Sequence, residues 1–394
     1  MFDVLMIGKG LMGSAAARYL QGLGAATAVL GPDEPQNPQT HDGVFASHYD
    51  QGRITRRLSK DITWATLADR SMAQYRELET RSGIQFYEPT GGLYVGPNDG
   101  SHAYWQNAAT IGQRFGVAYS ELTNDELAAR LPKLRFPAGF AGILEHAPAG
   151  YINPRGLIQA QLAVFAAQGG TILRETAVTI TYHPTHLTIQ TKEGNQYETR
   201  KLLIAAGGFS NCFGLLERPL PLRLKSETII LAELDAAEAA RLGDMPTVIY
   251  EIESPDISGI YLLPPIRYPD GRFYLKMGCD TRLDQTLPHD VEAIRRWFIH
   301  GNSDAILPAM RAALEDIIPE LRAESWQTKR CLITYTPHGK PLIDAVVPGQ
   351  VYVATGGNGS SAKSSDAIGQ LAASLTWHDA WQDTELDAQL YAIP

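Results

Sequence analysis

The feature that most constrains this chain is a glycine-rich turn between an apolar strand and a helix. Residues 2–7 form a short apolar run, GKGLMG follows at 8–13, and residues 11–23 are rich in helix formers. A second apolar strand is expected at 26–30. In GxGxxG, the first glycine makes a tight turn, the second lets backbone N–H groups approach a pyrophosphate, and the third allows close helix packing. The helix N-terminus adds a positive dipole, so this opening predicts a dinucleotide-binding βαβ unit.

The acidic residue expected to hold the ribose is missing from the end of the second strand. It usually stands about 20 residues after the glycines, where this chain has Gly31 in the stretch AVLGPDEP. Three replacements are compatible with the sequence: the carboxylate of Asp33, the carboxylate of Glu34, or backbone groups and water. The sequence therefore predicts the dinucleotide site without the ordinary contact to its adenosine.

The bulk properties of the chain exclude several classes of partner. The net charge is −9 and no long run of Lys or Arg occurs, so nucleic acid is not expected. No apolar stretch approaches the ~20 residues of a membrane span, and FDVLMIGKG at the N-terminus lacks the features of a signal peptide. Three widely spaced cysteines without a CxxC motif argue against a disulfide framework or a zinc site. We expect a cytoplasmic protein that holds no metal.

The order of the predicted elements suggests how the chain is divided. Between Leu222 and about Trp326, strand-like runs and two helices indicate an α+β region, whereas both ends have α/β character. The end of the chain repeats a strand, a glycine-rich turn and a helix at 351–355, 356–359 and 364–375. Other elements are expected as helices at 61–81, 120–131 and 151–168 and strands at 91–96, 170–175, 178–191 and 201–206. Glycine-rich turns at both ends favour FAD, a long cofactor commonly held by both ends of a chain, over NAD.

We therefore predict an α/β protein with a Rossmann-like FAD-binding domain and an inserted α+β substrate domain built on an antiparallel sheet. The length of 394 residues suggests roughly two or three domains. Residues 1–84, 142–222 and 326–394 are assigned to a discontinuous FAD-binding domain, and residues 85–141 and 223–325 to the substrate domain.

Several motifs together resemble one enzyme family over nearly the whole chain. They are FDVLMIGKGLMGSAAARYL, ASHYDQGRITRR, INPRGLIQAQLAVFAAQGG, YLKMGCD, KRCLITYTPHGKPLID and YVATGGNGSSAKSSDAIGQLAASL. In this combination the chain resembles the monomeric sarcosine oxidase and N-methyltryptophan oxidase family of D-amino-acid-oxidase-like flavoproteins.

The resemblance implies roles for individual residues. Cys331 matches the cysteine that carries the flavin through a thioether, and Lys276 matches the lysine at the site of oxygen reduction. Arg56 and Lys363 match the pair that binds the substrate carboxylate, and Arg53 matches an arginine close to the flavin with a catalytic role. The implied cofactor contacts are Gly8, Gly10, Leu11, Met12, Gly13, Ser47, His48, Arg53, Gly207, Cys331, Gly357, Gly359 and Lys363. Ile333 and Leu262 are the further implied substrate contacts.

Taken without the resemblance, the same residues allow simpler interpretations. Arg53 and Arg56 would share one face of a helical turn, either as a solvated basic face or as a carboxylate site. Lys363 is either a surface lysine or part of an anion site at a helix start. Lys276 is either a solvent-facing strand lysine or a buried one. Cys331 is either a core thiol or a thiolate favoured by the basic pair before it.

The chain departs from the family pattern at positions that border the substrate. Asp280 occupies a position where the family pattern has a histidine. Tyr49 and Gly52 occupy positions where it has His and Thr. Ile333 and Leu262 replace aromatic residues that would hold an amine by cation–π contact. We therefore expect an amino acid other than sarcosine, larger or more apolar.

The expected activity is FAD-dependent oxidation of the C–N bond of a secondary or N-substituted amino acid to an imine. O2 is the expected electron acceptor and hydrogen peroxide the product. Two alternatives stay open: a dehydrogenase of the same fold that passes electrons to a quinone or carrier protein, and a non-catalytic flavoprotein subunit. We expect the protein to act as a monomer.

Overall fold

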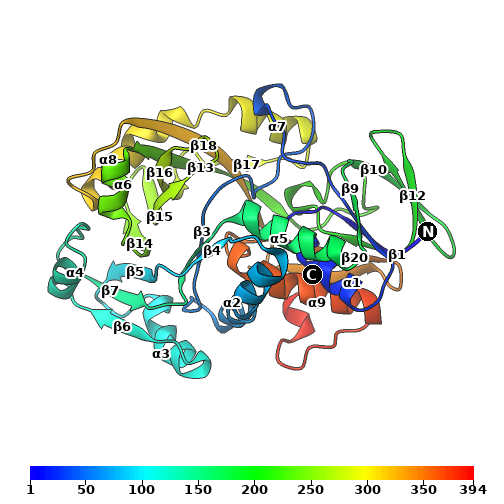
Figure 1. The fold of residues 1–394 in the computed structure, drawn as a ribbon, viewed down its shortest axis with the longest axis horizontal. Helices are drawn as coiled ribbons and strands as arrows, with labels where there is room; N and C mark the ends of the chain where they lie inside the picture. Colours follow the sequence, from blue (N-terminus) through cyan, green and yellow to red (C-terminus); the bar gives the residue numbers. More distant parts are fainter.

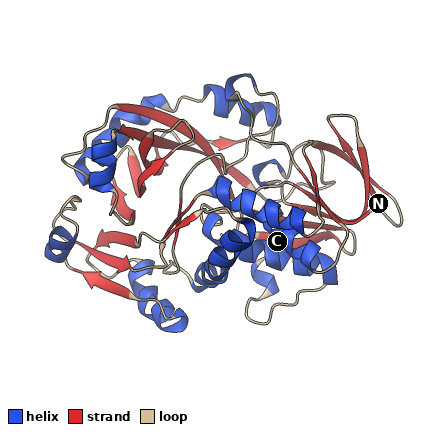
Figure 2. Ribbon diagram, viewed as in Figure 1, coloured by secondary structure: helices blue, strands red, loops and turns tan.

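The computed structural model describes residues 1–394, with side chains for residues 1–252 and 254–394. Two large β-sheets lie side by side along the long axis of the molecule (Figure 1), and most helices pack on their faces (Figure 2). Both chain termini lie with the first sheet, and the second sheet forms the other half of the molecule.

The first sheet has eight strands, and its centre is parallel. Strand β1 (Phe2–Ile7) pairs in parallel with β2 (Thr27–Leu30) on one side and β12 (Gln196–Ile204) on the other. The remaining strands are β9 (Thr171–Leu173), the hairpin of β10 (Ala177–Tyr182) and β11 (Leu187–Thr191), β19 (Leu342–Val347) and β20 (Val351–Thr355). The first, middle and last parts of the chain therefore meet in one Rossmann-like sheet, which confirms the predicted fold class.

Four helices cover this sheet: α1 (Leu11–Gly22), α2 (Ile62–Ser82), α5 (Pro154–Ala167) and α9 (Ser365–His378). The two ends of the chain meet where α1 packs on α9, coloured blue and red in Figure 1. This packing needs small residues, because a Cβ atom on Gly369 would lie 2.5 Å from the Cβ atom of Ala15. A buried ion pair of 2.7 Å joins Arg18 to Asp366 across the same interface. The C-terminal turn is thus fixed beside the N-terminal one.

The second sheet has nine strands and is antiparallel except where β14 pairs in parallel with β5. Its strands are β5 (Gly92–Pro97), β6 (Tyr119–Leu122), β7 (Phe140–Glu145), β13 (Arg223–Leu234), β14 (Thr247–Glu253), β15 (Ile257–Arg267), β16 (Phe273–Thr281), β17 (Thr286–Leu287) and β18 (Ser325–Tyr335). Helices α4 (Asn124–Arg130), α6 (Ala236–Leu242) and α8 (Leu307–Ile317) bury one face of this sheet in a hydrophobic core. The opposite face is left to line the cavity described below.

The remaining elements connect the two sheets. A small sheet contains β3 (Arg53–Thr55), β8 (Gly150–Ile152) and β4 (Tyr87–Glu88), and helices α3 (Ala103–Phe115) and α7 (Val291–His300) lie further out. Five 3-10 helices complete the chain: η1 (Pro38–Thr40), η2 (Gly207–Phe209), η3 (Asp304–Ile306), η4 (Ala362–Ser364) and η5 (Ala388–Leu390). Among the described residues, no helix has the length and hydrophobicity to cross a bilayer.

Strand β18 lies in the second sheet, where it pairs with β13 along its length. The sequence-based division placed residues 326–394 in the FAD-binding domain, so β18 joins the sheet attributed to the substrate domain. The predicted strand at 178–191 is a hairpin, because HPTH at 183–186 turns the chain between β10 and β11. The division into two domains itself stays a prediction.

Candidate active site

A cavity of about 740 Å³ is lined by residues of both large sheets. The first sheet contributes the glycine turn after β1, the loop after β12, and the segment after β20. The second sheet contributes Glu227 of β13, Gly259–Tyr261 of β15 and Cys331–Thr334 of β18. This volume is in the range of ligand and cofactor sites in proteins.

The three glycines of the turn differ in how closely other atoms approach them. Gly8 has φ +104, and a Cβ atom there would lie 2.4 Å from the carbonyl oxygen of Ala205. A Cβ atom on Gly13 would lie 1.8 Å from the carbonyl oxygen of Gly8, so the strand and helix approach closely. A Cβ atom on Gly10 would lie no closer than 3.8 Å to another atom, the Nδ1 of His48. Gly10 therefore has open space beside it, and it lines the cavity.

The start of helix α1 offers free hydrogen-bond donors to this part of the cavity. Gly10 is the N-cap residue and supplies no side-chain hydrogen bond to the first turn. Leu11 and Met12 line the cavity with Gly8 and Gly10, whereas Gly13 lies behind them. Unpaired N–H groups and the helix dipole favour an anion at this position. The turn therefore fits the pyrophosphate of a dinucleotide.

The ribose end of the cavity lacks a free carboxylate from the loop after β2. Lys9 forms an ion pair with Asp33, and its side chain lies 3.0 Å from where a Cβ atom of Gly31 would stand. Arg155 binds Glu34 through two hydrogen bonds of 2.6 and 2.7 Å. Gly31 lines the cavity but Asp33 and Glu34 do not. The backbone alternative is therefore the one that the geometry favours.

The predicted contacts from other loops also line the cavity. Ser47 donates a hydrogen bond of 2.9 Å to the carbonyl of Leu332, which joins the loop to strand β18. Burial and nearby cations lower the pKa of His48 to about 3, so its ring is neutral. Gly207, Gly357 and Gly359 line the cavity as well.

Arg56 and Lys363 come together at one end of the cavity. Both line it, and Lys363 is 5% exposed. Burial, with a smaller contribution from Arg56, lowers the pKa of Lys363 to about 7, against the opposing effects of Asp61 and Glu145. Nε of Arg56 is buried and has no hydrogen-bond partner among the described residues. Two neighbouring basic groups that line one cavity favour an anionic ligand.

Local structure explains the positions of these two cations. Residues 53–55 form strand β3, so Arg53 and Arg56 do not share the face of a helical turn. The guanidinium of Arg56 lies 5.0 Å from the ring centroid of Tyr104. Lys363 belongs to η4, where Tyr75 donates a hydrogen bond of 2.8 Å to its carbonyl and its ammonium lies 5.6 Å from the Trp64 ring centroid.

Lys276 is fully buried, so the interpretation of a solvent-facing strand lysine is wrong. Its ammonium donates to a carboxylate oxygen of Asp50 and, at 2.9 Å, to the carbonyl of Gly52. Asp50 also accepts from Arg53 and, at 2.8 Å, from Tyr268. Burial, then Arg53, lowers the pKa of Lys276 to about 8, and Asp50 opposes that shift. This network fixes Lys276 behind the cavity wall and Arg53 on it.

Asp50 is the central residue of that network, and sequence analysis assigned it no role. It is 4% exposed. Burial would raise its pKa, but Lys276 and Arg53 hold it well below the usual range. Arg53 extends from this pair to the cavity and donates a hydrogen bond of 2.8 Å to the carbonyl of Ser47. No pattern in the sequence pointed to Asp50, because two of its partners, Lys276 and Tyr268, lie more than 200 positions away along the chain.

Cys331 lies on the cavity wall, but its neighbours in sequence do not activate it. Burial raises the pKa of its thiol, and the cations that oppose the shift are Arg53 and Lys276. The Arg330 side chain points away and donates to carbonyls of the α7 end, including Gly301 at 2.7 Å. Lys329 lies 5.1 Å from the ring centroid of Tyr268. The prediction that the adjacent basic pair favours a thiolate is therefore wrong.

Of the two further substrate residues, only Ile333 lines the cavity. Leu262 is fully buried in the hydrophobic core on the opposite face of the second sheet. Strand alternation places the preceding residue, Tyr261, at the cavity instead. Its ring lies 5.4 Å from the ammonium of Lys276. The expectation that Leu262 contacts the substrate in place of an aromatic residue is therefore wrong, because Tyr261 provides an aromatic ring at the cavity.

Other cavity residues were found only in the structure. Glu227, Glu251 and Lys60 line it, and Asp280, noted as a departure, does so too. Glu251 pairs with Lys60 at 2.8 Å. Alternation along β13 and β14 could have placed the two glutamates on one face, but not against this cavity.

Comparisons with known proteins agree with this geometry. The family described as FAD dependent oxidoreductase (DAO) matches residues 3–375. The monomeric sarcosine oxidase of Bacillus sp. (strain NS-129) is 26% identical over 397 residues, covering 100% of this chain and 96% of that protein. The N-methyl-L-tryptophan oxidase of Salmonella newport is 27% identical over 208 residues, 52% of this chain and 53% of that one.

Solved structures share the fold at lower identity. The amino acid oxidase NikD, described as essential for nikkomycin biosynthesis, has a TM-score of 0.77 at 19% identity and covers 100% of this chain and 97% of that one. The glycine oxidase of Geobacillus kaustophilus has a TM-score of 0.73 at 18% identity, covering 100% and 98%.

Proposed function

The chain belongs to the FAD dependent oxidoreductase (DAO) family, and on that basis we propose that it oxidises the C–N bond of a secondary or N-substituted amino acid. The relatives named as sarcosine oxidase and N-methyl-L-tryptophan oxidase support a substrate of this kind. The observation that carries the proposal is the convergence of Arg56 and Lys363 in the cavity that the glycine turn also lines.

The residues of the cavity fit FAD. Gly10, Leu11 and Met12 would hold the pyrophosphate with the N–H groups of the first turn of α1, and Gly357 and Gly359 would approach the cofactor by their backbone. Bound FAD supplies the two-electron acceptor for oxidation of the substrate. The chain itself supplies binding, orientation and fixed charges.

Arg56 and Lys363 would bind the substrate carboxylate. The guanidinium fork of Arg56 suits a carboxylate, and the residue lines the cavity together with Lys363. Lys363, with a pKa of about 7, gains a counter-charge when a carboxylate enters, so its ammonium form is favoured in the complex. Orientation of the α-carbon by these two groups would lower the entropic part of the barrier.

We further propose O2 as electron acceptor, with hydrogen peroxide as product. Lys276 supports this assignment because its ammonium is held by Asp50 and Gly52 in a fully buried position. A fixed cation stabilises negative charge that develops on oxygen during reduction. With a pKa of about 8, most of the Lys276 side chains carry that charge at neutral pH.

We also propose that Cys331 carries the cofactor covalently. Its position on the cavity wall beside Arg53 supports this role, although the high pKa of the thiol means that neighbouring cations must assist ionisation. The free cysteines Cys212, Cys279 and Cys331 fit a reducing compartment such as the cytoplasm.

The experiment that tests the function is anaerobic mixing of the FAD-loaded protein with a panel of N-methyl and cyclic amino acids. Loss of the flavin absorbance identifies substrates, and admission of air with peroxide detection identifies the acceptor. Arg56→Ala should bind FAD normally but lose substrate affinity about tenfold to hundredfold, the value of a charged hydrogen bond. Arg135→Ala, an exposed arginine with 63% of its side chain accessible, is the control. A panel without any bleaching would remove the proposal, and dye reduction without peroxide would favour a dehydrogenase.

A further inference from the structure

The second sheet places a row of functional side chains on the cavity wall. Glu227 of β13 stands directly opposite Cys331 of β18 in the register. On its other side, β13 pairs with β16, where Gly278 stands opposite Ile229 and the next residue on the same face is Asp280. Glu227, Asp280 and Cys331 all line the cavity. Two carboxylates therefore face the same space as the cysteine.

Glu227 has an unused acceptor although it is buried. Glu227 is 4% exposed. Within the described part of the chain its side chain takes part in one hydrogen bond, which Lys225 donates to Oε2 at 3.0 Å. Oε1 receives no hydrogen bond from any described residue, and the side chain lines the cavity. Because Oε1 is not fully enclosed by protein, it can accept a hydrogen bond from a ligand in the cavity.

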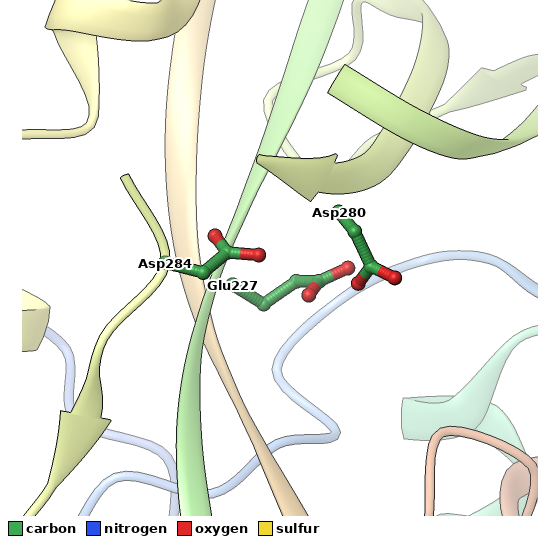
Figure 3. Close-up of side chains that lie close together, drawn as sticks. All are labelled: Glu227, Asp280 and Asp284. Carbon is green, nitrogen blue, oxygen red and sulfur yellow. The ribbon is translucent and has the colours of Figure 1, made fainter. Parts of the chain in front are cut away.

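The carboxylates around Glu227 outnumber their cation. Figure 3 shows Glu227, Asp280 and Asp284 gathered beside β13. The ammonium of Lys225 contacts all three, at 3.0 Å from Glu227 and 2.7 Å from Asp284. One ammonium balances one carboxylate, so this group keeps a negative excess. Burial, and to a lesser degree Asp284 and Asp280, raises the pKa of Glu227 to about 7 against the effect of Lys225.

A metal ion is a poor explanation for this cluster. The ammonium of Lys225 already stands among the three carboxylates, where a cation shared by them would lie. Asp284 is also engaged, because it accepts hydrogen bonds of 2.9 Å from both the backbone and the hydroxyl of Thr281. What remains available is Oε1 of Glu227 and the exposed side of Asp280, whose side chain is 60% accessible.

Charges of both signs line the cavity, and they come from different elements of the chain. Arg56, which follows β3, and Lys363 of η4 form the cationic part, whereas Glu227 and Asp280 come from β13 and β16. Glu227 acts on Tyr261 and Cys331, whose pKa values it raises after the larger effect of burial. A ligand that satisfies both parts has a carboxylate at one end and a cationic nitrogen at the other.

The reacting amine is not the group that best suits Glu227. Oxidation of a C–N bond requires the lone pair of the amine, whereas a neighbouring carboxylate stabilises its protonated form. A nitrogen that remains protonated throughout the reaction gains from this carboxylate without that disadvantage. The two carboxylates therefore suit a side-chain nitrogen.

We propose that Glu227 and Asp280 bind a cationic group on the side chain of the substrate, so that the substrate is an N-substituted or cyclic amino acid with a second, basic nitrogen. This inference rests on the proposed amino acid oxidation and names its substrate class. It replaces the expectation of a more apolar amino acid.

The test measures binding, so that turnover is not required. Dissociation constants of hexanoate and 6-aminohexanoate, and of pentanoate and 5-aminopentanoate, are measured with the FAD-loaded protein by calorimetry. These probes carry the carboxylate and differ in the terminal ammonium, and none has an α-amine to oxidise. The aminocarboxylate of at least one pair should bind about tenfold to hundredfold more tightly, as expected for a hydrogen bond between charged groups.

Variants assign that advantage to the proposed residues. Glu227→Gln should remove the preference for the ammonium, and Asp280→Asn, at a largely exposed position that folding tolerates, should reduce it. Glu233→Gln is the matched control, because Glu233 lies on the same face of β13 but outside the cavity, in an ion pair of 2.9 Å with Arg272. It should keep the wild-type preference.

The outcomes separate this inference from the proposed function. If plain and amino-substituted carboxylates bind equally, or if Glu227→Gln retains the preference, the inference is overturned while the carboxylate site stands. If no carboxylate binds, the site at Arg56 and Lys363 fails, and the proposed function and this inference fail with it.

Discussion

Binding of a small carboxylate should depend steeply on pH because Lys363 must gain a proton to act as a cation. Its pKa is about 7, lowered first by burial and then by Arg56, with Asp61 and Glu145 opposing. Below pH 7 the side chain is an ammonium and binds the anion. Above pH 7 it is neutral, and each further pH unit should weaken apparent affinity about tenfold. A carboxylate such as acetate is a suitable probe, since it can occupy the cationic part of the cavity alone.

The magnitude follows from the protonated fraction of Lys363. At pH 6 the apparent dissociation constant of acetate should be about equal to that of the fully protonated site. At pH 9 it should be about a hundredfold larger. Binding at pH 8 should take up about 0.9 proton, because about nine-tenths of the free sites are neutral and the bound carboxylate restores the charge. At pH 6 the uptake should fall to about 0.1 proton.

Calorimetry in buffers of different ionisation enthalpy measures both quantities with the FAD-loaded protein. Lys363→Met keeps an apolar chain against Trp64 but removes the titrating group, so its acetate affinity should be low and nearly independent of pH. Lys192→Met changes an exposed lysine that pairs with Asp42 at 2.8 Å and should behave as wild type. A wild-type affinity that stays constant from pH 6 to pH 9 would refute the reasoning. So would a Lys363→Met variant that retains the slope, because another group would then be titrating.

Three further predictions concern other parts of the site. Cys331→Ser should give a colourless pellet after denaturation of FAD-loaded protein, whereas Cys212→Ser and Cys279→Ser should stay yellow; a yellow Cys331→Ser pellet would remove the covalent proposal. Gly13→Ala should lose FAD binding and several kcal/mol of stability, since its Cβ atom would lie 1.8 Å from the oxygen of Gly8. Gly22→Ala, in the same helix with its nearest contact at 3.5 Å, should instead gain about 0.5–1 kcal/mol in urea unfolding, and equal losses in both variants would contradict this account. Asp50→Asn should lower the free energy of unfolding by about 3–5 kcal/mol at pH 7 and slow reoxidation by air, because Lys276 and Arg53 lose their shared carboxylate. The folded-state pKa of Asp50 is depressed, so its contribution is present above about pH 4 and shrinks as pH falls further; a stability difference from wild type that persists unchanged in acid would argue against this charge pairing.

Local patterns in the sequence predicted the elements whose form depends on near neighbours. The GKGLMG turn, the apolar strand before it and the alanine-rich helix after it form as expected, because the steric need for glycine acts within a few residues. The second glycine-rich strand and turn at the end of the chain were predicted in the same way. The charge and apolar pattern also excluded a long apolar span, which agrees with the helices described.

Resemblance to a family supplied what local patterns could not. Arg56, Lys363 and Cys331 each had a simpler interpretation from the sequence alone, and the structure brings all three to one cavity. At the position implied as a substrate contact, strand alternation decided the outcome, since Leu262 faces the core and Tyr261 faces the cavity.

The sequence by itself thus determined the dinucleotide turn, the α/β framework and the absence of a basic or long apolar surface segment, because each depends on composition or on short-range sterics. Only the tertiary structure decided which charges are buried and which partners they meet. Lys276 meets Asp50 across more than 200 positions, and Glu227 meets Asp280 and Cys331 by strand register. The ionisation of a side chain depends on its burial and on charges within a few ångströms, and those neighbours are set by how distant strands pair.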